Sequence, residues 1–256
     1  MLRRLDLNSD MGERDNSEGL SLDAALMPFI TSVNIACGGH AGNPDLMRRT
    51  AALAVEHGVA IGAHPGLPDR QTFGRAEREV NADEVLTLMS EQLMACASLL
   101  EAEGFRLKHV KPHGALYNMA ARNEDIAEGI VAAVRKVDRS LLLFALAGSV
   151  LARRAEASGL RVVHEGFADR AYHGNGRLVP RSEAGAVLEQ EAEVREQLRL
   201  LMNETVMTVE RTVIPLSIQS LCLHSDTPQA LALAVIIRQE LERAGIEVVA
   251  ASHVDR

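Results

Sequence analysis

The sequence contains no tryptophan, two tyrosines and five phenylalanines among its 256 residues. Aromatic rings are the usual stacking platforms for sugars and bases, so large carbohydrate ligands and base-stacking grooves are disfavoured, whereas small polar ligands remain open. Cysteine is also scarce. Cys37, Cys96 and Cys222 are odd in number and far apart, which excludes a disulfide framework or a zinc ribbon, and we expect all three to be buried structural residues.

Long apolar runs and an excess of basic charge are absent as well. No run of 18 apolar residues occurs, and the basic start is not followed by an apolar stretch, so neither a membrane span nor a signal peptide is expected. A reducing, cytoplasmic setting is the default expectation. The net charge of −8 argues against nucleic-acid binding, which needs a clustered basic face.

The composition that remains is that of a globular protein, with 47% hydrophobic and 24% charged residues. Short apolar runs, often β-branched, alternate with long amphipathic stretches, which predicts buried parallel strands separated by helices. A strand, loop, helix and glycine follow one another repeatedly, which indicates a parallel sheet or a (β/α) barrel in a single domain over residues 1–256. The expected strands are 4–7, 33–37, 59–63, 107–110, 141–146, 160–164, 218–223 and 246–250.

Helix boundaries are marked by capping residues and glycines. Asn43-Pro44 predicts one helix start, and Asn81 with Glu84 forms a capping-box pattern at another. Further helices are expected over 123–138, 149–159 and 183–203, and from Thr227-Pro228 to Gly245. Residues 166–182 and about 205–216 interrupt the alternation. Within the first stretch, Gly174-Asn175-Gly176 predicts a turn, and hence a hairpin insertion, between 170–173 and 177–179.

Ionisable side chains follow six of the eight expected strands. In a (β/α) barrel the carboxyl ends of the strands meet at one mouth, where catalytic residues gather. The glycines and helix ends lie at the opposite ends of the strands, and this asymmetry predicts an active site at the mouth. The candidates are Asn8, Asp10, Glu13, His40, His64, Lys111, His113, Glu165, Asp169, His224 and Asp226.

Each candidate has a functional and a structural interpretation. Asp10, His40 and His64 form a set that could hold a divalent metal with an open position, although capping and satisfied structural histidines are commoner for each residue alone. Lys111, a surface lysine in the plainer interpretation, could stabilise an oxyanion or hold a carboxylate. Arg170 and Arg181 could bind a substrate carboxylate, or form ion pairs that pin the hairpin. For Asp226, helix capping is the stronger interpretation.

Several common motifs are missing. The sequence has no GxxxxGK[ST] phosphate loop, no HExxH, no GxSxG and no GxGxxG after a strand. Conventional P-loop binding of ATP and Rossmann cofactor binding are therefore not expected.

Taken together, the motifs resemble the LamB/YcsF family, whose characterised members are the A subunits of bacterial ATP-dependent 5-oxoprolinases. The resemblance spans almost the whole chain, and its motifs are highly specific as a set. They are DLNSDMGE (6–13), NIACGGHAGNP (34–44), VAIGAHPGLPD (59–69), HVKPHGALY (109–117), EGFADRAYHGNGRLVPRS (165–182) and CLHSDTP (222–228).

The resemblance implies a seven-stranded (β/α) barrel of the glycoside hydrolase/deacetylase type, with the eighth expected strand as an extra or edge strand. It implies ATP-dependent opening of 5-oxoproline to glutamate with two partner subunits. It also implies a divalent metal on Asp10, His40 and His64. Gly39 stands where the family pattern usually has an aromatic residue, which would enlarge the pocket beside His40 and bears on which lactam is bound.

The expected chemistry is that of lactam opening. An unstrained lactam must be activated by phosphorylation or by a metal, a base must deliver water, and a donor must stabilise the oxyanion. We expect Asp10 or His40 to act as base or ligand, His64 as ligand or acid, Lys111 at the oxyanion, and Arg170 or Arg181 at the substrate carboxylate. Two alternatives are a stand-alone metal-dependent deacetylase or amidohydrolase and a non-catalytic regulatory subunit; a homo-oligomer is compatible with each.

Overall fold

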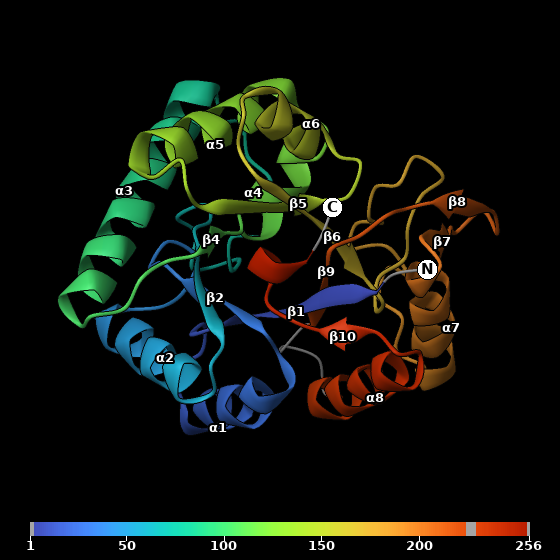
Figure 1. Ribbon diagram of the computed structural model, residues 1–256. Helices are drawn as coiled ribbons and strands as arrows, with labels where there is room; N and C mark the ends of the chain where they lie inside the picture. Colours follow the sequence, from blue (N-terminus) through green and yellow to red (C-terminus); the bar gives the residue numbers. More distant parts are fainter. Residues whose placement is uncertain (1–2, 224–228, 255–256) are drawn as a thin grey trace.

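The computed structural model describes residues 3–223 and 229–254 (Figure 1). Seven parallel strands form a closed barrel, because β9 pairs with both β6 and β1. The predicted (β/α)7 barrel is therefore confirmed. Its strands are β1 (Arg4–Met11), β2 (Ser32–Ala36), β3 (Ala60–His64), β4 (His109–Val110), β5 (Leu142–Leu146), β6 (Val162–Phe167) and β9 (Ser220–Leu223).

An eighth parallel strand lies beside the barrel, as the resemblance implied. This strand, β10 (Glu247–Val248), pairs with Arg4 and Leu5 at the beginning of β1, just before the stretch of β1 that pairs with β9. It extends the sheet next to the seam where the barrel closes.

Helices surround the strands (Figure 1). The Asn43 side chain caps α2, and Asn81 with Glu84 forms the predicted capping box of α3. The predicted start of the last helix at Thr227-Pro228 lies outside the described residues. The helices are α1 (Ser17–Leu26), α2 (Pro44–Glu56), α3 (Ala82–Ala102), α4 (Gly114–Ala120), α5 (Glu124–Val137), α6 (Val150–Ala157), α7 (Glu191–Met202) and α8 (Ala230–Arg243), with the 3₁₀ turns η1 (Met27–Phe29) and η2 (Ala251–His253).

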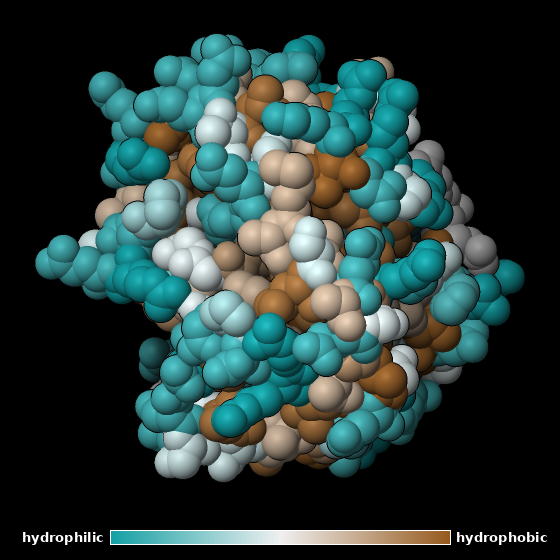
Figure 2. All heavy atoms as spheres, turned by 90° about the vertical axis from the view of Figure 1, so that its left-hand side faces the viewer, coloured by the Kyte–Doolittle hydropathy of each residue, from teal (hydrophilic) through white to brown (hydrophobic). Residues whose placement is uncertain are grey.

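One described helix, α3, is long and apolar enough to cross a membrane by length and composition alone. It packs against α5 and buries one face, including Val85, Met89 and Leu93, in the core. Figure 2 views the molecule from this side and shows mostly hydrophilic residues with smaller hydrophobic patches among them. The apolar composition of α3 is thus explained in part by its place in the outer layer of the barrel.

Two boundaries differ most from the sequence-based expectation. The first strand was expected to end at Leu7, but β1 continues to Met11, so Asn8 and Asp10 lie within the strand. The helix expected over 183–203 begins only at Glu191. The reason is that residues 183–190 run back along the preceding segment: Ala186 O accepts from Ala171 N, and Leu188 N donates to Asp169 O.

The insertion after β6 contains the predicted turn. Tyr172 and Leu178 form an antiparallel bridge around Gly174–Gly176, and His173 N donates to Arg177 O. The later interruption forms a small antiparallel pair, β7 (Thr205–Met207) and β8 (Val213–Pro215). These two additions lie on one side of the barrel, where the insertion overhangs the mouth.

The barrel interior is polar at its centre. Along β1, Leu5, Leu7 and Met11 belong to the hydrophobic core, whereas Asp6 and Asn8 are fully buried among polar partners. Asp6 accepts hydrogen bonds from the hydroxyls of Thr31, Ser32 and Ser220 and from the backbone N–H of Ala251. Burial outweighs these donors and raises the pKa of Asp6 from 3.8 to about 6.

This carboxyl group makes stability depend on pH. The pKa of Asp6 is higher in the folded state, so between about pH 4 and pH 6 this carboxyl group is protonated in the folded chain and ionised in the unfolded chain. The protonated carboxyl group stabilises the folded state, and this contribution is lost as pH rises through 6. We expect the difference in unfolding free energy between the wild type and Asp6→Asn to change by roughly 3 kcal/mol between pH 4 and pH 8, with the wild type losing stability. Denaturant titrations at both pH values, with exposed Asp125→Asn as control, measure this change. An equal difference at both pH values would refute it.

Candidate functional site

Eight of the predicted site residues form one connected set of contacts at the mouth and in the upper interior of the barrel. They come from five strands, β1, β2, β3, β4 and β6, and the loops that follow them, so chain topology alone brings them together. They are Asn8, Asp10, Glu13, His40, His64, Lys111, His113 and Glu165. The predicted residues His224 and Asp226 lie outside the described residues.

Three histidines and a glutamate form the first part of this set, which we call the histidine cluster: Glu13, His40, His64 and His113. Their ligand atoms all lie within 4.8 Å of one another. The rings of His40 and His113 stack at 3.6 Å between centroids, and Glu13 Oε1 lies 3.0 Å from His40 Nε2 and 3.5 Å from His113 Nδ1. All three imidazoles are buried.

Backbone carbonyls fix the orientation of two of these rings. His64 Nδ1 lies 2.7 Å from the carbonyl of Lys111, and His113 Nε2 lies 2.8 Å from the carbonyl of Phe73. A carbonyl only accepts, so each of these nitrogens carries the proton. The remaining nitrogens, His64 Nε2 and His113 Nδ1, then face one another at 2.9 Å with their lone pairs.

Such facing lone pairs need a shared proton or a cation between them. Burial lowers the pKa of His40 to about 2 and the pKa of His113 well below 6.5, so these two imidazoles are neutral, which is the ligating form. Four of the distances between ligand atoms, from 2.9 to 3.9 Å, lie near the separation of about 3.4 Å between the ligands of tetrahedral zinc, and all of the ligand atoms lie within 4.8 Å of one another. The carbonyls behind His64 and His113 are the outer partners that metal-bound histidines usually have. The residues therefore fit a divalent metal.

The predicted metal set is only partly the one that the structure brings together. His40 and His64 belong to the histidine cluster, but Glu13 and His113 complete it, and Asp10 is not among the four. Asp10 Oδ2 lies 3.3 Å from His64 Nε2, at the border between the cluster and Lys111. No ligand spacing in the sequence could reveal this, because the four residues come from separate segments.

Close backbone packing holds the cluster together. Gly74 has φ of +64°, and a Cβ there would lie 2.7 Å from His40 Cβ. Phe73, the residue before it, meets both His40 and His113 edge-on with its ring. Sequence reasoning did not single out Phe73, although it precedes a glycine in a loop close to a histidine motif.

Lys111 forms the second part of the set. Its ammonium lies 3.0 Å from Asp10 Oδ1 and 2.9 Å from Glu165 Oε1, and it donates to Asn8 Oδ1 at 3.1 Å. Burial opposes its charge, but Asp10, Cys222 and Glu165 outweigh burial and hold the pKa of Lys111 well above 10.5. Burial likewise opposes the charge of Asp10, yet His64 and Lys111 keep the pKa of Asp10 well below 3.8. The site therefore carries a fixed positive charge between two carboxylates.

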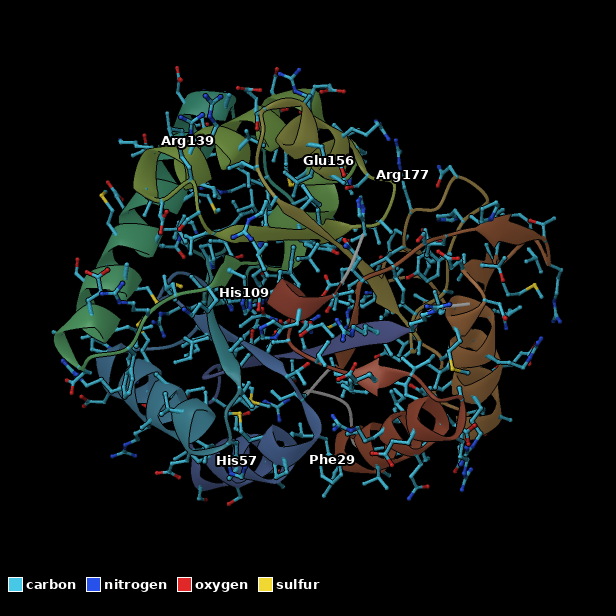
Figure 3. The ribbon with its side chains drawn as sticks, viewed as in Figure 1. Phe29, His57, His109, Arg139, Glu156 and Arg177 are labelled. Carbon is cyan, nitrogen blue, oxygen red and sulfur yellow. The ribbon has the colours of Figure 1, made fainter. Side chains whose placement is uncertain are left out.

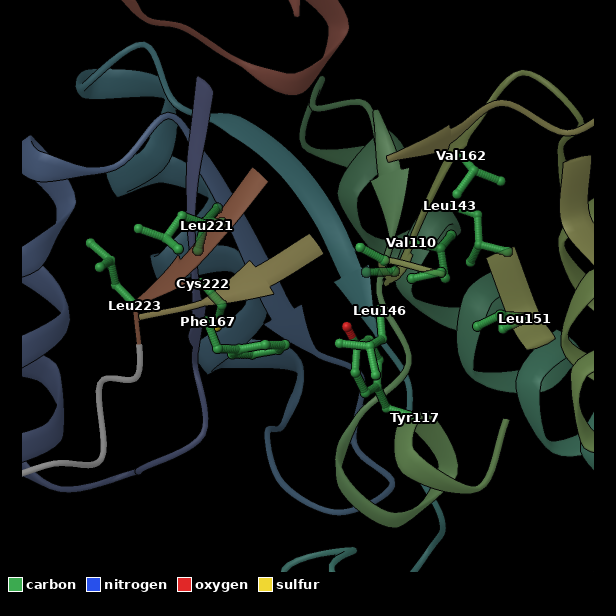
Figure 4. Close-up of a cluster of buried hydrophobic side chains, with 14 of the residues drawn as sticks. Val110, Tyr117, Leu143, Leu146, Leu151, Val162, Phe167, Leu221, Cys222 and Leu223 are labelled. Atoms are coloured by element: carbon green, nitrogen blue, oxygen red, sulfur yellow. The ribbon is translucent and has the colours of Figure 1, made fainter. Parts of the chain in front are cut away.

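Below Lys111, polar residues that sequence reasoning missed connect the strands. Asn34 donates to Asn8 and Asp10, and His109 Nε2 lies 2.8 Å from Asn34 Oδ1, toward the centre of the barrel (Figure 3). The Tyr117 hydroxyl donates to Glu165 Oε2 at 2.7 Å. Figure 4 shows Tyr117, Phe167 and Cys222 among the buried side chains of this region.

Arg170 and Arg181, the two arginines predicted either to bind a substrate carboxylate or to pin the hairpin, have different surroundings. Arg170 is buried, and its guanidinium donates to the carbonyls of Ala186 and Val179, so it braces the insertion. Burial, followed by the charge of Arg181, lowers the pKa of Arg170 to about 10. Arg181 makes no side-chain hydrogen bond or ion pair within the described part of the chain and lines the mouth. Asp169 is buried beside them.

The space beside Gly39 is not an enlarged pocket, contrary to expectation. The side chain of Gln92 occupies it, since a Cβ on Gly39 would lie 2.5 Å from Gln92 Oε1. The Gln92 amide donates to Gly66 O at 2.8 Å and accepts from Gly66 N at 3.1 Å. A glutamine on α3 thus fills the position and clamps the loop that follows His64.

The mouth itself is a small polar pocket of about 60 Å³. Asp10, His64, Lys111 and His113 form its floor, and Tyr117 and Phe167 are among its walls. Charged groups in so confined a space are preorganised donors and acceptors for a small polar ligand.

Comparison with known proteins agrees with the motif analysis. The chain is 47% identical over 251 residues to the 5-oxoprolinase A subunit of Methylococcus capsulatus, covering 98% of this chain and 96% of that one. It is 44% identical to the protein of the same name from Bacillus subtilis, over 97% of both chains. A solved structure of a lactam utilization protein from Thermus thermophilus matches with a TM-score of 0.88 at 39% identity, over 96% of this chain and 99% of that one.

More distant structures share the fold alone. A family 4 carbohydrate esterase from Streptomyces lividans matches with a TM-score of 0.50 at 15% identity, over 98% of this chain and 95% of that chain. The model of the LamB/YcsF family matches residues 5–256, which is almost the whole chain. The resemblance seen in the motifs is confirmed, and the chain belongs to the LamB/YcsF family.

Proposed function

We propose that this chain is the A subunit of an ATP-dependent 5-oxoprolinase, which opens the lactam ring of 5-oxoproline to L-glutamate together with two partner subunits. The observation that carries this proposal is a buried ammonium held between two carboxylates beside the histidine cluster, at the mouth of the barrel. Relatives named as A subunits of 5-oxoprolinases, at 43–47% identity, support it.

The residues at the mouth match what lactam opening demands. Water must add to the carbonyl carbon while the ring C–N bond breaks and the nitrogen gains a proton. Asp10 lines the pocket with 17% of its side chain exposed, so its carboxylate can orient water, take a proton from it and return that proton to the ring nitrogen as the C–N bond breaks. Lys111 stabilises the negative charge on the former carbonyl oxygen. Arg181, at the rim, is placed to pair with an anionic group of the substrate, such as its carboxylate.

Glu13, His40, His64 and His113 would hold a divalent metal in this proposal. When bound, such an ion supplies Lewis-acid polarisation of an oxygen or a lowered pKa of bound water. Asn8, Asn34, Glu165 and Tyr117 keep Lys111 and Asp10 in place by hydrogen bonds. Phosphorylation of the lactam at the expense of ATP, by the assembled complex, would supply further activation.

The test is release of glutamate from 5-oxoproline by this chain mixed with its partner subunits and ATP. We expect release to require this chain and to fall at least about 100-fold in His40→Ala, because the cluster loses a buried ring. His57→Ala, an exposed histidine on the outside of the barrel (Figure 3), is the matched control and should leave release unchanged.

The other outcomes separate the rival functions. Full release with His40→Ala would indicate a non-catalytic regulatory subunit. If the partners are folded and bound but no glutamate appears, assays of other cyclic amides, and of small acetylated amides without ATP, would distinguish a different lactamase from a stand-alone deacetylase.

A further inference from the structure

A groove of about 1000 Å³ adjoins the mouth pocket. The loop around Arg75 and helix α4 line one side of it, and the insertion over residues 170–182 lines the other. The groove and the mouth share Arg75, Gly114, Asn118, Arg170, Leu178 and Arg181 in their walls. A ligand in the groove therefore reaches the mouth without crossing the protein.

Basic side chains dominate the groove. Five arginines line it, against two glutamates: Arg75, Arg122, Arg170, Arg177 and Arg181, with Glu77 and Glu210. Glu77 pairs with Arg122, and Glu210 lies 3.7 Å from His173 Nδ1, so both carboxylates already have partners. The chain as a whole carries a net charge of −8, whereas the groove is locally positive because of these arginines.

Two of these arginines have no partner in the described part of the chain. Arg177 and Arg181 make no side-chain hydrogen bond or ion pair there, whereas Arg170 and Arg122 are engaged. Arg177 lines the groove but not the mouth, and Figure 3 shows it on the insertion. Unengaged guanidinium groups facing a cavity are suited to bidentate binding of phosphate oxygens.

The sizes of the two cavities point the same way. The mouth holds about 60 Å³, enough for the reacting end of a ligand, whereas about 1000 Å³ reaches the upper end of the usual range for ligand pockets. A lactam with a single ring leaves most of the groove unfilled. The unfilled part of the groove, together with the positive charge of the arginines that line it, indicates that the ligand has a second, anionic part.

We propose that the arginine-lined groove binds a phosphate-bearing ligand, with the phosphate among Arg177, Arg181 and their neighbours and the reacting end directed toward Lys111. Two kinds of ligand carry such a phosphate group: a nucleotide, through its polyphosphate, and the activated lactam, through its phosphoryl group. The identity of the lactam rests on the proposed function, but the phosphate site is tested without it.

The test is calorimetric titration of the full chain with ATP and with inorganic phosphate, in the presence of a chelator so that a bound metal does not contribute. We expect Arg177→Ala to weaken binding roughly tenfold and the double variant with Arg181→Ala to weaken it roughly 100-fold, in proportion to the charge-assisted hydrogen bonds lost. Arg139→Ala removes an exposed arginine remote from the groove and should leave affinity unchanged (Figure 3). Affinity should also fall as salt is raised.

The two sources give different patterns. ATP binding much more tightly than phosphate, regardless of added 5-oxoproline, identifies a nucleotide site. Phosphate binding that tightens when 5-oxoproline is present identifies a phosphorylated substrate. Absence of binding by both probes, or binding equal in the wild type and Arg177→Ala, overturns the proposal. Arginine-dependent phosphate binding without glutamate release by the complex would leave this site standing and contradict the proposed function alone.

Discussion

Lys111→Met is expected to lower glutamate release by the assembled complex by roughly 100- to 1000-fold. The ammonium is the one described cation that lies within 3.1 Å of Asn8, Asp10 and Glu165 together, and its removal takes away the donor assigned to the oxyanion. Initial rates with saturating ATP and 5-oxoproline measure the loss. Release within a few-fold of the wild type would contradict the assignment.

The same substitution tests folding, and the two effects can be separated. Removing one partner of a buried ion pair costs about 3–5 kcal/mol, because Glu165 is left buried without the ammonium beside it. The double variant Lys111→Met with Glu165→Gln removes the orphaned charge as well. We expect it to recover much of the unfolding free energy while release stays low. Recovery of both would mean that Lys111 acts only on stability.

Removal of the metal ligands is expected to have an effect of similar size. Glu13→Ala and His64→Ala should each weaken binding of zinc at least about 100-fold, because each removes a ligand from a group whose donors lie within 4.8 Å of one another. Metal content after dialysis, and titration of the metal-free chain with zinc, measure the affinity. Chelation should likewise abolish glutamate release, and added metal should restore it.

Asp10→Asn decides between the two ligand sets. If Glu13, His40, His64 and His113 hold the metal, this variant keeps zinc affinity within about tenfold of the wild type, yet loses release, because the base is gone. If Asp10 is itself a ligand, zinc affinity falls as far as in His64→Ala. Unchanged zinc binding in Glu13→Ala, His64→Ala and the wild type would show that the cluster is not a metal site.

The fold was predictable because the signals for it are local. Capping residues such as Asn43 and Asn81, and glycines after the helices, mark boundaries through backbone geometry within a few residues. The length of β1 was not predictable in this way. Its polar residues after Leu7 resemble a loop, but their backbone pairs with β2, and Asn8 is buried against Asn34 and Glu165.

The candidate site was predictable as a region and less so as a set of partners. Asp10, His64 and Lys111 lie at the carboxyl ends of parallel strands, so the barrel brings them to one mouth regardless of the conformation of the loops. Whether Asp10 or Glu13 completes the histidine cluster depends on the path of the loop after β1 over a few ångströms. Arg170 illustrates the same limit, because its guanidinium turns toward the carbonyls of Val179 and Ala186, and nothing in its neighbouring sequence indicates that choice.

The closing seam of the barrel bears on how the chain is synthesised. Asp6, near the start, bonds to Ser220, 214 residues later, and β1 also pairs with β10 at Glu247 and Val248. A ribosome needs roughly 10 to 40 s to add that many residues. Throughout that time β1 lacks its last two neighbours, and its carboxylate and amide side chains keep their water. The nascent barrel therefore stays an open sheet until β9 and β10 have been synthesised, when closure and burial of this polar row occur together.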